Sequence, residues 1–272
     1  MTSADFDCIR NFVRAEAAIV IEPGMEYLVE SRLQELAHKE CFPTLDDLIA
    51  KFRANPKDGL SRKIVDAMTT NETSFFRDIH PFEALKTTIL PELLRRNAAQ
   101  RRLNVWCGAA STGQETFSVL MTIAEHFPDL LAWNLHYLAT DLCQDALARC
   151  KMGRFSQFEV NRGLPAQLLV KHFTRQGAEW EFRPDLRKRV DFREMNLVKD
   201  WHPMPPLDVV FLRNVLIYFD VETKKAILAK VRQAMRPSGI LLLGGSETTF
   251  NLDDGFERVI CGKATCYRVK ER

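Results

Sequence analysis

The chain of 272 residues is long enough for one large domain or two domains of ordinary size. Hydrophobic residues make up 46% of it and charged residues 27%, which is the composition of ordinary globular proteins. A formal net charge of +2 gives no strong attraction to nucleic acid or to a lipid surface. The composition therefore favours neither a nucleic-acid-binding nor a membrane-inserted protein.

The N-terminus lacks the basic start and apolar segment of a secretory signal, and no stretch approaches the roughly 20 apolar residues of a membrane span. The seven cysteines are odd in number and lack the spacing of a zinc site. The six histidines do not cluster either. We therefore expect a cytoplasmic protein with free thiols and no metal site.

The pattern of the first 70 residues predicts a small helical domain. Apolar residues recur at helical spacing between Met25 and Leu36, directly after Pro23-Gly24. Thr44 is placed as the N-cap of a second helix, which runs through Phe52. Apolar residues within 64–68 indicate a third.

From residue 80 onward the pattern alternates between helices and apolar strands. This alternation predicts an α/β fold whose parallel sheet is covered on both faces. The expected helices are about 85–94, 114–127, 143–152 and 222–235; the expected strands are 103–107, 135–140, 207–212 and 240–243, with a closing hairpin at 259–261 and 265–269.

Residues 153–195 interrupt this alternation and are predicted to form a small insertion of strands and a short helix. Basic residues outnumber acidic ones there, whereas acidic residues dominate in 1–70. The basic excess either docks an acidic partner or forms a solvated face.

The loop after the first strand is the first candidate ligand site. Gly108 and Gly113 have the spacing of a phosphate-binding loop, but Gln114 and Glu115 stand where that loop needs Lys and Ser or Thr. The Glu115 carboxylate would repel a phosphate and attract a cation. S-adenosylmethionine carries a sulfonium, an ammonium and no phosphate, so it fits this loop better than a dinucleotide.

Other polar residues follow later strands, at the edge where open α/β sheets bind ligands. Asp141 ends the second strand, where it can accept hydrogen bonds from an adenosine ribose or simply cap the next helix. Asn196 follows the strand in FREMNL and can hydrogen-bond adenine. The segment 213–219, RNVLIYF, either lines the site or consists of core aromatics and a surface arginine. It lacks the Asn/Asp-Pro-Pro-Tyr/Phe motif of exocyclic amine methyltransferases, which argues against a base amine as the substrate.

The segment 68–78 joins the helical and α/β regions. Phe75 and Phe76 are expected to pack in the core. Asn71, Thr73 and Arg77 are harder to explain by packing, and junctions between domains are common pocket sites.

Together these segments resemble the chemotaxis receptor methyltransferases, the CheR family, over essentially the whole chain. The resemblance lies in TTNETSFFRD at 69–78, VWCGAASTGQETFS at 105–118, LATD at 138–141, MNL at 195–197 and RNVLIYF at 213–219. It implies an enzyme that transfers a methyl group from S-adenosylmethionine to glutamate side chains of bacterial chemoreceptors, with S-adenosylhomocysteine as product.

The family also implies a domain layout. A helical domain would occupy residues 1–70, and a methyltransferase domain with a class I, Rossmann-like sheet would occupy residues 71–272. An antiparallel β-subdomain would be inserted at about 153–195.

Carried over residue by residue, the resemblance implies a cofactor site and two catalytic residues. Arg77 would orient the substrate carboxylate, and Tyr218 would add a hydrogen bond near the reacting methyl group. With Gly108 of the loop, the expected cofactor site comprises Asn71, Thr73, Arg77, Gly108, Glu115, Asp141, Asn196, Leu197, Asn214 and Val215.

The sequence departs from the family pattern at two places. The loop commonly reads Gly-Glu-Glu-Pro-Tyr-Ser in the family and reads Gly-Gln-Glu-Thr-Phe-Ser here, so Phe117 lacks a hydroxyl group. The insertion is short between Phe173 and Phe182, where members that dock on a receptor's C-terminal pentapeptide have a longer loop. We therefore expect a monomer that binds the cytoplasmic domain of methyl-accepting chemoreceptors independently of such a pentapeptide.

Two other functions remain open from the sequence. A small-molecule carboxyl methyltransferase would use the same cofactor site but would have no need of a docking insertion. A cofactor-binding adaptor without turnover would have no need of Arg77 and Tyr218.

Overall fold

The computed structural model describes residues 1–56 and 58–271, and the chain divides into two compact units. The first unit comprises Met1–Thr70 and Tyr218–Thr223, and the second comprises Asn71–Ile217 and Lys224–Arg272. The short segment 218–223 is therefore distant in sequence from the rest of its unit.

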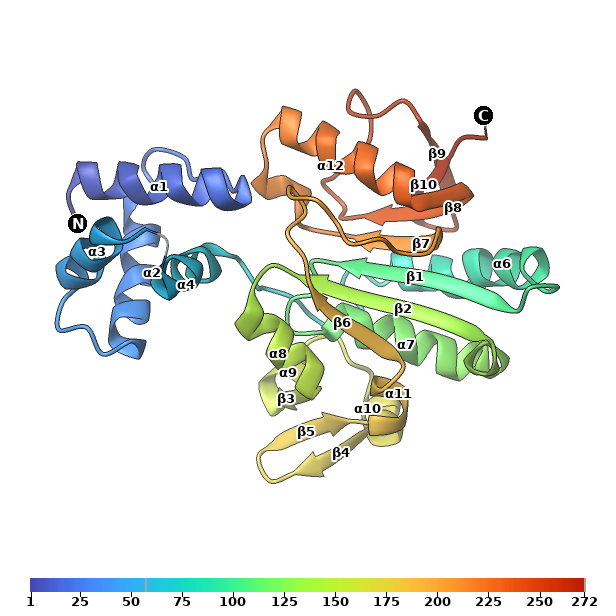
Figure 1. Cartoon of the computed structure of the whole chain (residues 1–272). Coiled ribbons are helices and arrows are strands. Elements are labelled where there is room, and N and C mark those ends of the chain that lie inside the picture. The colour runs from blue at the N-terminus through green and yellow to red at the C-terminus, as the bar shows by residue number, and fades with distance from the viewer. Residues whose placement is uncertain (57, 272) are drawn as a thin grey trace. The chain divides into compact units, whose positions relative to one another are not determined.

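The first unit is helical, with apolar faces that pack on a shared core. Its helices are α1 (Ser3–Ala17), α2 (Glu26–Lys39), α3 (Leu45–Ala54) and α4 (Gly59–Met68) (Figure 1). The Thr44 side chain accepts the N–H of Asp47 at 3.1 Å, which confirms the predicted N-cap of α3. Helix α1 was not among the helices predicted from the spacing of apolar residues.

A backbone hydrogen bond and an ion pair join the segment 218–223 to the rest of the first unit. Val20 donates its N–H to the carbonyl oxygen of Tyr218 at 2.9 Å. The Arg14 guanidinium lies 3.0 Å from the Asp220 carboxylate. Tyr218 itself is half-buried.

The second unit is built on a seven-stranded sheet of order β6-β2-β1-β7-β8-β10-β9 (Figure 1). Neighbouring strands run parallel from β6 to β8, whereas β10 runs antiparallel to both β8 and β9. The strands are β1 (Arg102–Gly108), β2 (Asn134–Asp141), β6 (Val190–Glu194), β7 (Leu207–Leu212), β8 (Met235–Leu243), β9 (Phe256–Cys261) and β10 (Ala264–Val269). This sheet confirms the predicted α/β fold of class I methyltransferase type and its closing hairpin.

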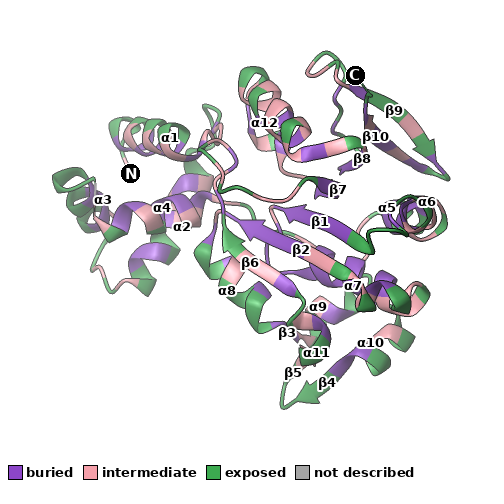
Figure 2. Ribbon diagram, turned by 45° about the vertical axis from the view of Figure 1, so that its right-hand side comes forward, coloured by how far each residue is buried: buried purple, intermediate pink, exposed green. Residues whose placement is uncertain are grey.

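Helices cover both faces of this sheet, as the buried central strands β1 and β7 require (Figure 2). Val105 and Cys107 of β1 belong to one core with α7. Because side chains alternate along a strand, Trp106 points to the opposite face, where its ring lies 5.1 Å from that of Trp201. The Lys230 ammonium of α12 lies 4.7 Å from the Trp201 ring, so α12 covers that second face.

Three helices begin and end close to the predicted positions: α7 (Gln114–His126), α8 (Gln144–Met152) and α12 (Val221–Ala234). The short 3₁₀ helices η2 (Pro128–Ala132) and η3 (Leu216–Tyr218) were not predicted. The single helix expected at 85–94 is instead divided into α5 (His80–Ala84), the π-helical η1 (Leu85–Ile89) and α6 (Leu90–Arg96). Pro91 has no N–H to donate, which accounts for an interrupted ladder in this segment.

The inserted segment forms a three-stranded antiparallel sheet of order β3-β5-β4 with short helices. Its elements are β3 (Arg154–Ser156), α9 (Gln157–Asn161), α10 (Ala166–His172), β4 (Phe173–Gln176), β5 (Glu179–Phe182) and α11 (Pro184–Arg187). The structure differs in one respect from the bounds predicted for the insertion, residues 153–195. Its last strand, β6, pairs in parallel with β2 and so belongs to the large sheet.

Aromatic side chains fasten the inserted segment to the large sheet. The ring centroids of Phe117 on α7 and Phe182 on β5 lie 4.4 Å apart, and Phe155 lies 5.8 Å from Phe117. Phe117 is fully buried, so the residue that departs from the family pattern contributes to this aromatic core.

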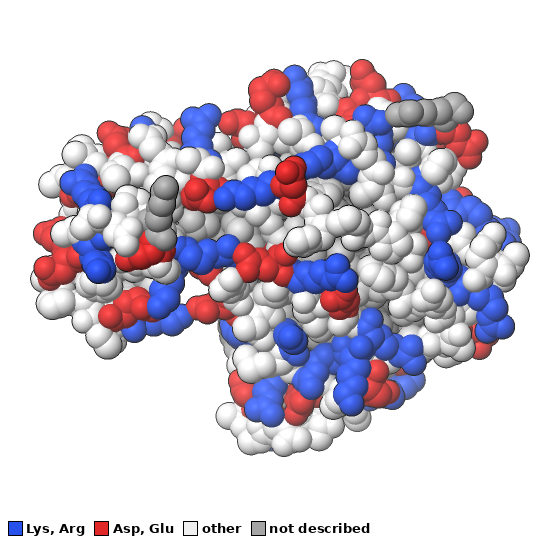
Figure 3. Space-filling model, in the orientation of Figure 1, with Lys and Arg blue, Asp and Glu red and all other residues white. Residues whose placement is uncertain are grey.

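Basic side chains gather near α10 and α11 on the face seen in Figure 3. Several of them are paired within the unit: Arg187 lies 3.2 Å from Glu181, and Lys171 lies 2.7 Å from Glu125. This local pairing favours a solvated face over a docking surface for the basic excess of the insertion.

Candidate functional site

The carboxyl ends of the parallel strands meet at one edge of the large sheet. Gly108 of β1 pairs with Thr140 of β2 and with Leu212 of β7, and Leu212 pairs with Leu243 of β8. The loops that follow these strands are therefore neighbours, which is where open α/β sheets bind their ligands.

The loop after β1 turns sharply before α7 begins. Ala109 and Ser111 have φ angles of 55° and 51°, and Gly113 has a φ of 103°. A Cβ atom at Gly113 would lie 2.7 Å from the Cys150 sulfur, so both the backbone angle and the available space require glycine. The loop thus packs closely and presents the start of α7 to the sheet edge.

Asp141, at the end of β2, ties this loop in place. Its Oδ2 accepts the N–H of Ser111 at 2.7 Å, and its Oδ1 accepts the N–H of Cys143, the N-cap residue of α8, at 2.8 Å. Its bond to Cys143 shapes the turn before α8, whereas, within the described part of the chain, no side-chain hydrogen bond caps that helix.

A buried arginine links the loops after β1 and β7 to the segment before α5. Arg213 follows β7 with its side chain 1% exposed. It lies 2.5 Å from the Glu115 carboxylate and 2.6 Å from the Asp78 carboxylate. One cation thus faces two carboxylates. The alternative that this segment contributes a surface arginine is therefore wrong.

Arg213 also fixes the turn that carries Arg77. Its guanidinium donates to the carbonyl oxygen of Arg77 at 3.1 Å. Three residues around Arg77 have positive φ angles: 48° at Phe76, 65° at Asp78 and 40° at Ile79. Such angles are unfavourable for non-glycine residues, and a β-branched Ile is the most strained of these, so surrounding bonds must hold the turn.

The polar residues before this turn lie near the opening loop. The Ser111 hydroxyl donates to the carbonyl oxygen of Asn71 at 2.7 Å. Thr73 and Arg77 are half-buried, and the Arg77 guanidinium donates to the carbonyl oxygen of Glu72 at 3.2 Å. The segment 71–77 is thereby joined to the loop after β1 within the second unit.

The loop after β7 is held by Glu247, which follows β8. Oε1 of its buried carboxylate accepts the N–H groups of Val215 and Leu216 at 2.9 and 2.7 Å. Oε2 accepts those of Asn214 and Gly244 at 2.8 and 2.7 Å. Four backbone donors thus share one carboxylate and fix the positions of the two expected cofactor residues, Asn214 and Val215.

Asn196 and Leu197 follow β6 at the same edge. The Asn196 side chain accepts the N–H of Val198 at 3.1 Å, and the N–H of Met195 donates to the Asp141 carbonyl oxygen at 3.0 Å. Lys230 donates to the carbonyl oxygen of Leu197 at 2.6 Å. This turn is therefore joined to both β2 and α12.

The thiols near the loop are not suited to nucleophilic catalysis. Burial, and then the negative charge of Glu115, raise the pKa of the Cys107 thiol well above its ordinary value. Burial likewise raises the pKa of Cys150, with Asp141 adding to the effect. Because the thiolate is the reactive form, both groups are inert near neutrality.

The expected cofactor residues all belong to the second unit, in the loops at this edge or in the segment 71–77 joined to them. Tyr218 belongs to the first unit. Sequence reasoning missed Glu247 and the roles of Asp78 and Arg213. Arg213 was visible as the first residue after an apolar strand, but Glu247 lies in a loop without a recognised motif.

Within the described residues 1–56 and 58–271, no group of three or more His, Cys, Asp or Glu side chains is placed to hold a metal ion. In the same part of the chain, no helix combines the length and the apolar character needed to cross a membrane.

Comparisons with known proteins agree with the geometry of this edge. Residues 71–264 match the model of the CheR methyltransferase, SAM binding domain. The chain is 38% identical over 270 residues to the chemotaxis protein methyltransferase Cher2 of Pseudomonas putida, covering 98% of each chain. It is 39% identical to chemotaxis protein methyltransferase 1 of Pseudomonas aeruginosa, again covering 98% of each. The chemotaxis protein methyltransferase of Escherichia coli is 29% identical, with 94% of this chain and 88% of that protein covered.

We predict that Glu247→Gln destabilises the protein by about 2–4 kcal/mol, because the amide N–H₂ would face backbone N–H groups that need an acceptor. Chemical denaturation measures the change. Glu257→Gln, at an exposed position on β9, is the matched control and should stay within about 0.5 kcal/mol of the wild type. Equal effects of the two substitutions would contradict the role given to Glu247.

Proposed function

This chain belongs to the CheR methyltransferase family, and we propose that it methylates glutamate side chains of chemoreceptors. Family membership makes it an S-adenosylmethionine-dependent methyltransferase of the chemotaxis type. The glutamate substrate, the ester product and the roles of individual residues form the proposal.

The observation that carries the proposal is the charge balance at the sheet edge. Glu115 and Asp78 share the single guanidinium of Arg213, and Asp141 lies one strand away on the same edge. Carboxylates therefore outnumber the buried cation, which suits a cofactor with a sulfonium and an ammonium and would repel a phosphate. The residues present thus fit S-adenosylmethionine.

We assign the cofactor contacts accordingly. Glu115 would attract the ammonium of the methionine end, and Asp141 would accept hydrogen bonds from the ribose hydroxyls. Asn196 and Leu197 would flank the adenine. The rest of the cofactor site would be lined by Asn214 and Val215, which Glu247 holds in place, and by Asn71, Thr73 and Gly108.

S-adenosylmethionine supplies the methyl group when it is bound, and the protein positions the acceptor. A glutamate side chain has a reference pKa of about 4.3, so its carboxylate needs no general base near neutrality. Arg77 would orient that carboxylate, and Tyr218 would add a hydrogen bond near the reacting methyl group. The main contribution is orientation with exclusion of water, because too strong an ion pair with Arg77 would stabilise the ground state.

The partner and the compartment are part of the same proposal. The pairing of β4 with β5 extends as far as Gln176 and Glu179, so the hairpin turn is only two residues long. This short turn supports docking on the receptor's cytoplasmic domain without a C-terminal pentapeptide. All seven cysteines are free thiols, in keeping with the reducing cytoplasm, and we propose that the protein acts there as a monomer.

We predict that Arg77→Ala lowers turnover on a receptor fragment by on the order of a hundredfold, because the acceptor carboxylate loses its orienting partner. Steady-state kinetics measure this change, and circular dichroism checks that the fold is retained. Arg175→Ala, at an exposed position on β4, removes the same charge and should leave turnover unchanged. Wild-type turnover in Arg77→Ala would refute the assignment.

Incubation with methyl-labelled S-adenosylmethionine and receptor cytoplasmic fragments tests the function itself. A glutamate methyl ester releases labelled methanol on treatment with base, and the proposal predicts this release from the receptor. Label found only on small carboxylic acids would favour the small-molecule alternative. Cofactor binding without any transfer would favour the adaptor alternative.

A further inference from the structure

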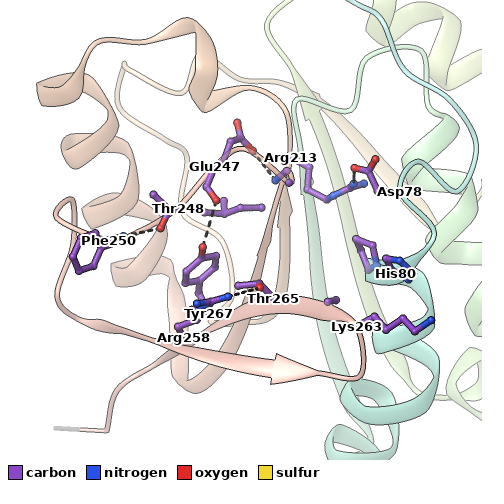
Figure 4. A pocket seen from close by; sticks show the side chains of 15 residues that line it. Asp78, His80, Arg213, Glu247, Thr248, Phe250, Arg258, Lys263, Thr265 and Tyr267 are labelled. Carbon is purple, nitrogen blue, oxygen red and sulfur yellow. Dashed lines mark hydrogen bonds and ion pairs between the residues drawn. The ribbon is translucent and has the colours of Figure 1, made fainter.

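A cavity of about 460 Å³ lies in the second unit beside the Arg213–Asp78 ion pair (Figure 4). It is bounded by the turn at Asp78, the loop after β8 and the β9–β10 hairpin. Apolar groups such as Leu243 and Pro81 line it together with several cations. None of the residues expected to bind the cofactor lines this cavity, so its chemistry calls for a separate account.

The β9–β10 hairpin presents two cations to the cavity. Arg258 lies directly opposite Tyr267 in the strand pairing, so both side chains project from the same face of the hairpin. The Arg258 guanidinium donates to the Thr265 hydroxyl at 3.3 Å, and this bond holds it against that face. Lys263 lines the cavity from the turn of the hairpin.

These two cations are the unneutralised charges of the cavity. Arg213 already faces Glu115 and Asp78. Arg258 and Lys263 are exposed, and neither is in an ion pair within the part of the chain that the structure describes. The mouth of the cavity therefore carries positive charge above a partly apolar floor, which favours a carboxylate on an aliphatic stem.

The exposed side chains at the mouth of the cavity indicate that its ligand is a macromolecule. Phe250, at the mouth, is 75% exposed. Pockets for small molecules bury 70–90% of their ligand, whereas protein interfaces combine exposed aromatic side chains with cations at an open surface. The cavity also begins at Asp78, the residue directly after Arg77, and so lies next to the proposed reaction centre.

On the basis of the proposed function, we propose that this cavity docks an acidic side chain of the protein substrate. That side chain flanks the glutamate being methylated. Lys263 binds its carboxylate, Arg258 adds positive charge farther along the hairpin, and Phe250 packs against the neighbouring apolar surface of the substrate. Docking here fixes the substrate segment alongside Arg77 and selects glutamates that have an acidic neighbour.

The test is the kinetics of Lys263→Glu with a receptor cytoplasmic fragment. Reversing the charge replaces attraction by repulsion, so the KM for the fragment should rise about fivefold or more, while the affinity for S-adenosylhomocysteine is unaffected. Raising the salt concentration should increase the wild-type KM and have a smaller effect on that of the variant. Phe250→Ser, which removes an exposed ring, should also raise the KM.

Lys270→Glu is the matched control, because it makes the same charge change at an exposed residue just beyond β10 and outside the cavity. Equal KM values for Lys263→Glu and Lys270→Glu, with normal methyl transfer by the wild type, would overturn the docking proposal alone. No transfer to any receptor by the wild type would overturn the proposed function and this docking with it. A third outcome is that inorganic phosphate binds the wild type but not Lys263→Glu, while the two proteins have the same KM for the receptor fragment. This outcome would assign the cavity to a small anion and overturn the docking proposal.

Discussion

The arrangement at the sheet edge depends on one buried guanidinium. Arg213 follows β7, lies against the Phe82 ring at 5.9 Å and holds the carboxylates of Glu115 and Asp78. Arg213 and these partners come from three segments that are far apart in the sequence. Burying a charge is unfavourable unless it is paired and hydrogen-bonded, so the three segments must assemble together. The same ion pairs hold the strained turn that presents Arg77 and leave an excess of negative charge for a cationic cofactor.

Hydrogen bonds from backbone N–H groups to two carboxylates also hold the loops at this edge. Glu247 collects four N–H groups from the loops after β7 and β8, and Asp141 collects two from the loops after β1 and β2. Each carboxylate thereby replaces the hydrogen bonds that a turning backbone cannot make with itself. Loops fixed in this way form a preorganised site, which reduces the loss of entropy when a ligand binds.

Much of this architecture could be predicted from the sequence, because local patterns encode it. The period of the apolar residues predicted the alternating strands and helices, and the glycine loop and Asp141 were placed at the edge where the carboxyl ends of the parallel strands meet. Long-range polar pairing has no such local signal. Glu247 lies more than 30 residues from three of the four N–H groups it accepts, and Arg213 lies more than 90 residues from Glu115. The sequence left β6 ambiguous: its residues were counted in the insertion, although Asn196 just after it was placed at the edge of the large sheet. A five-residue strand does not by itself reveal which sheet it joins.

The most direct test of this account is a double-mutant cycle between positions 213 and 78, measured as the free energy of unfolding. Arg213→Lys keeps the charge but lacks the guanidinium fork, and Asp78→Asn removes the carboxylate. If the buried guanidinium holds the turn through Asp78, the two substitutions should be coupled by at least about 1 kcal/mol. Effects that add within about 0.3 kcal/mol would show that the two side chains act independently and would contradict the account.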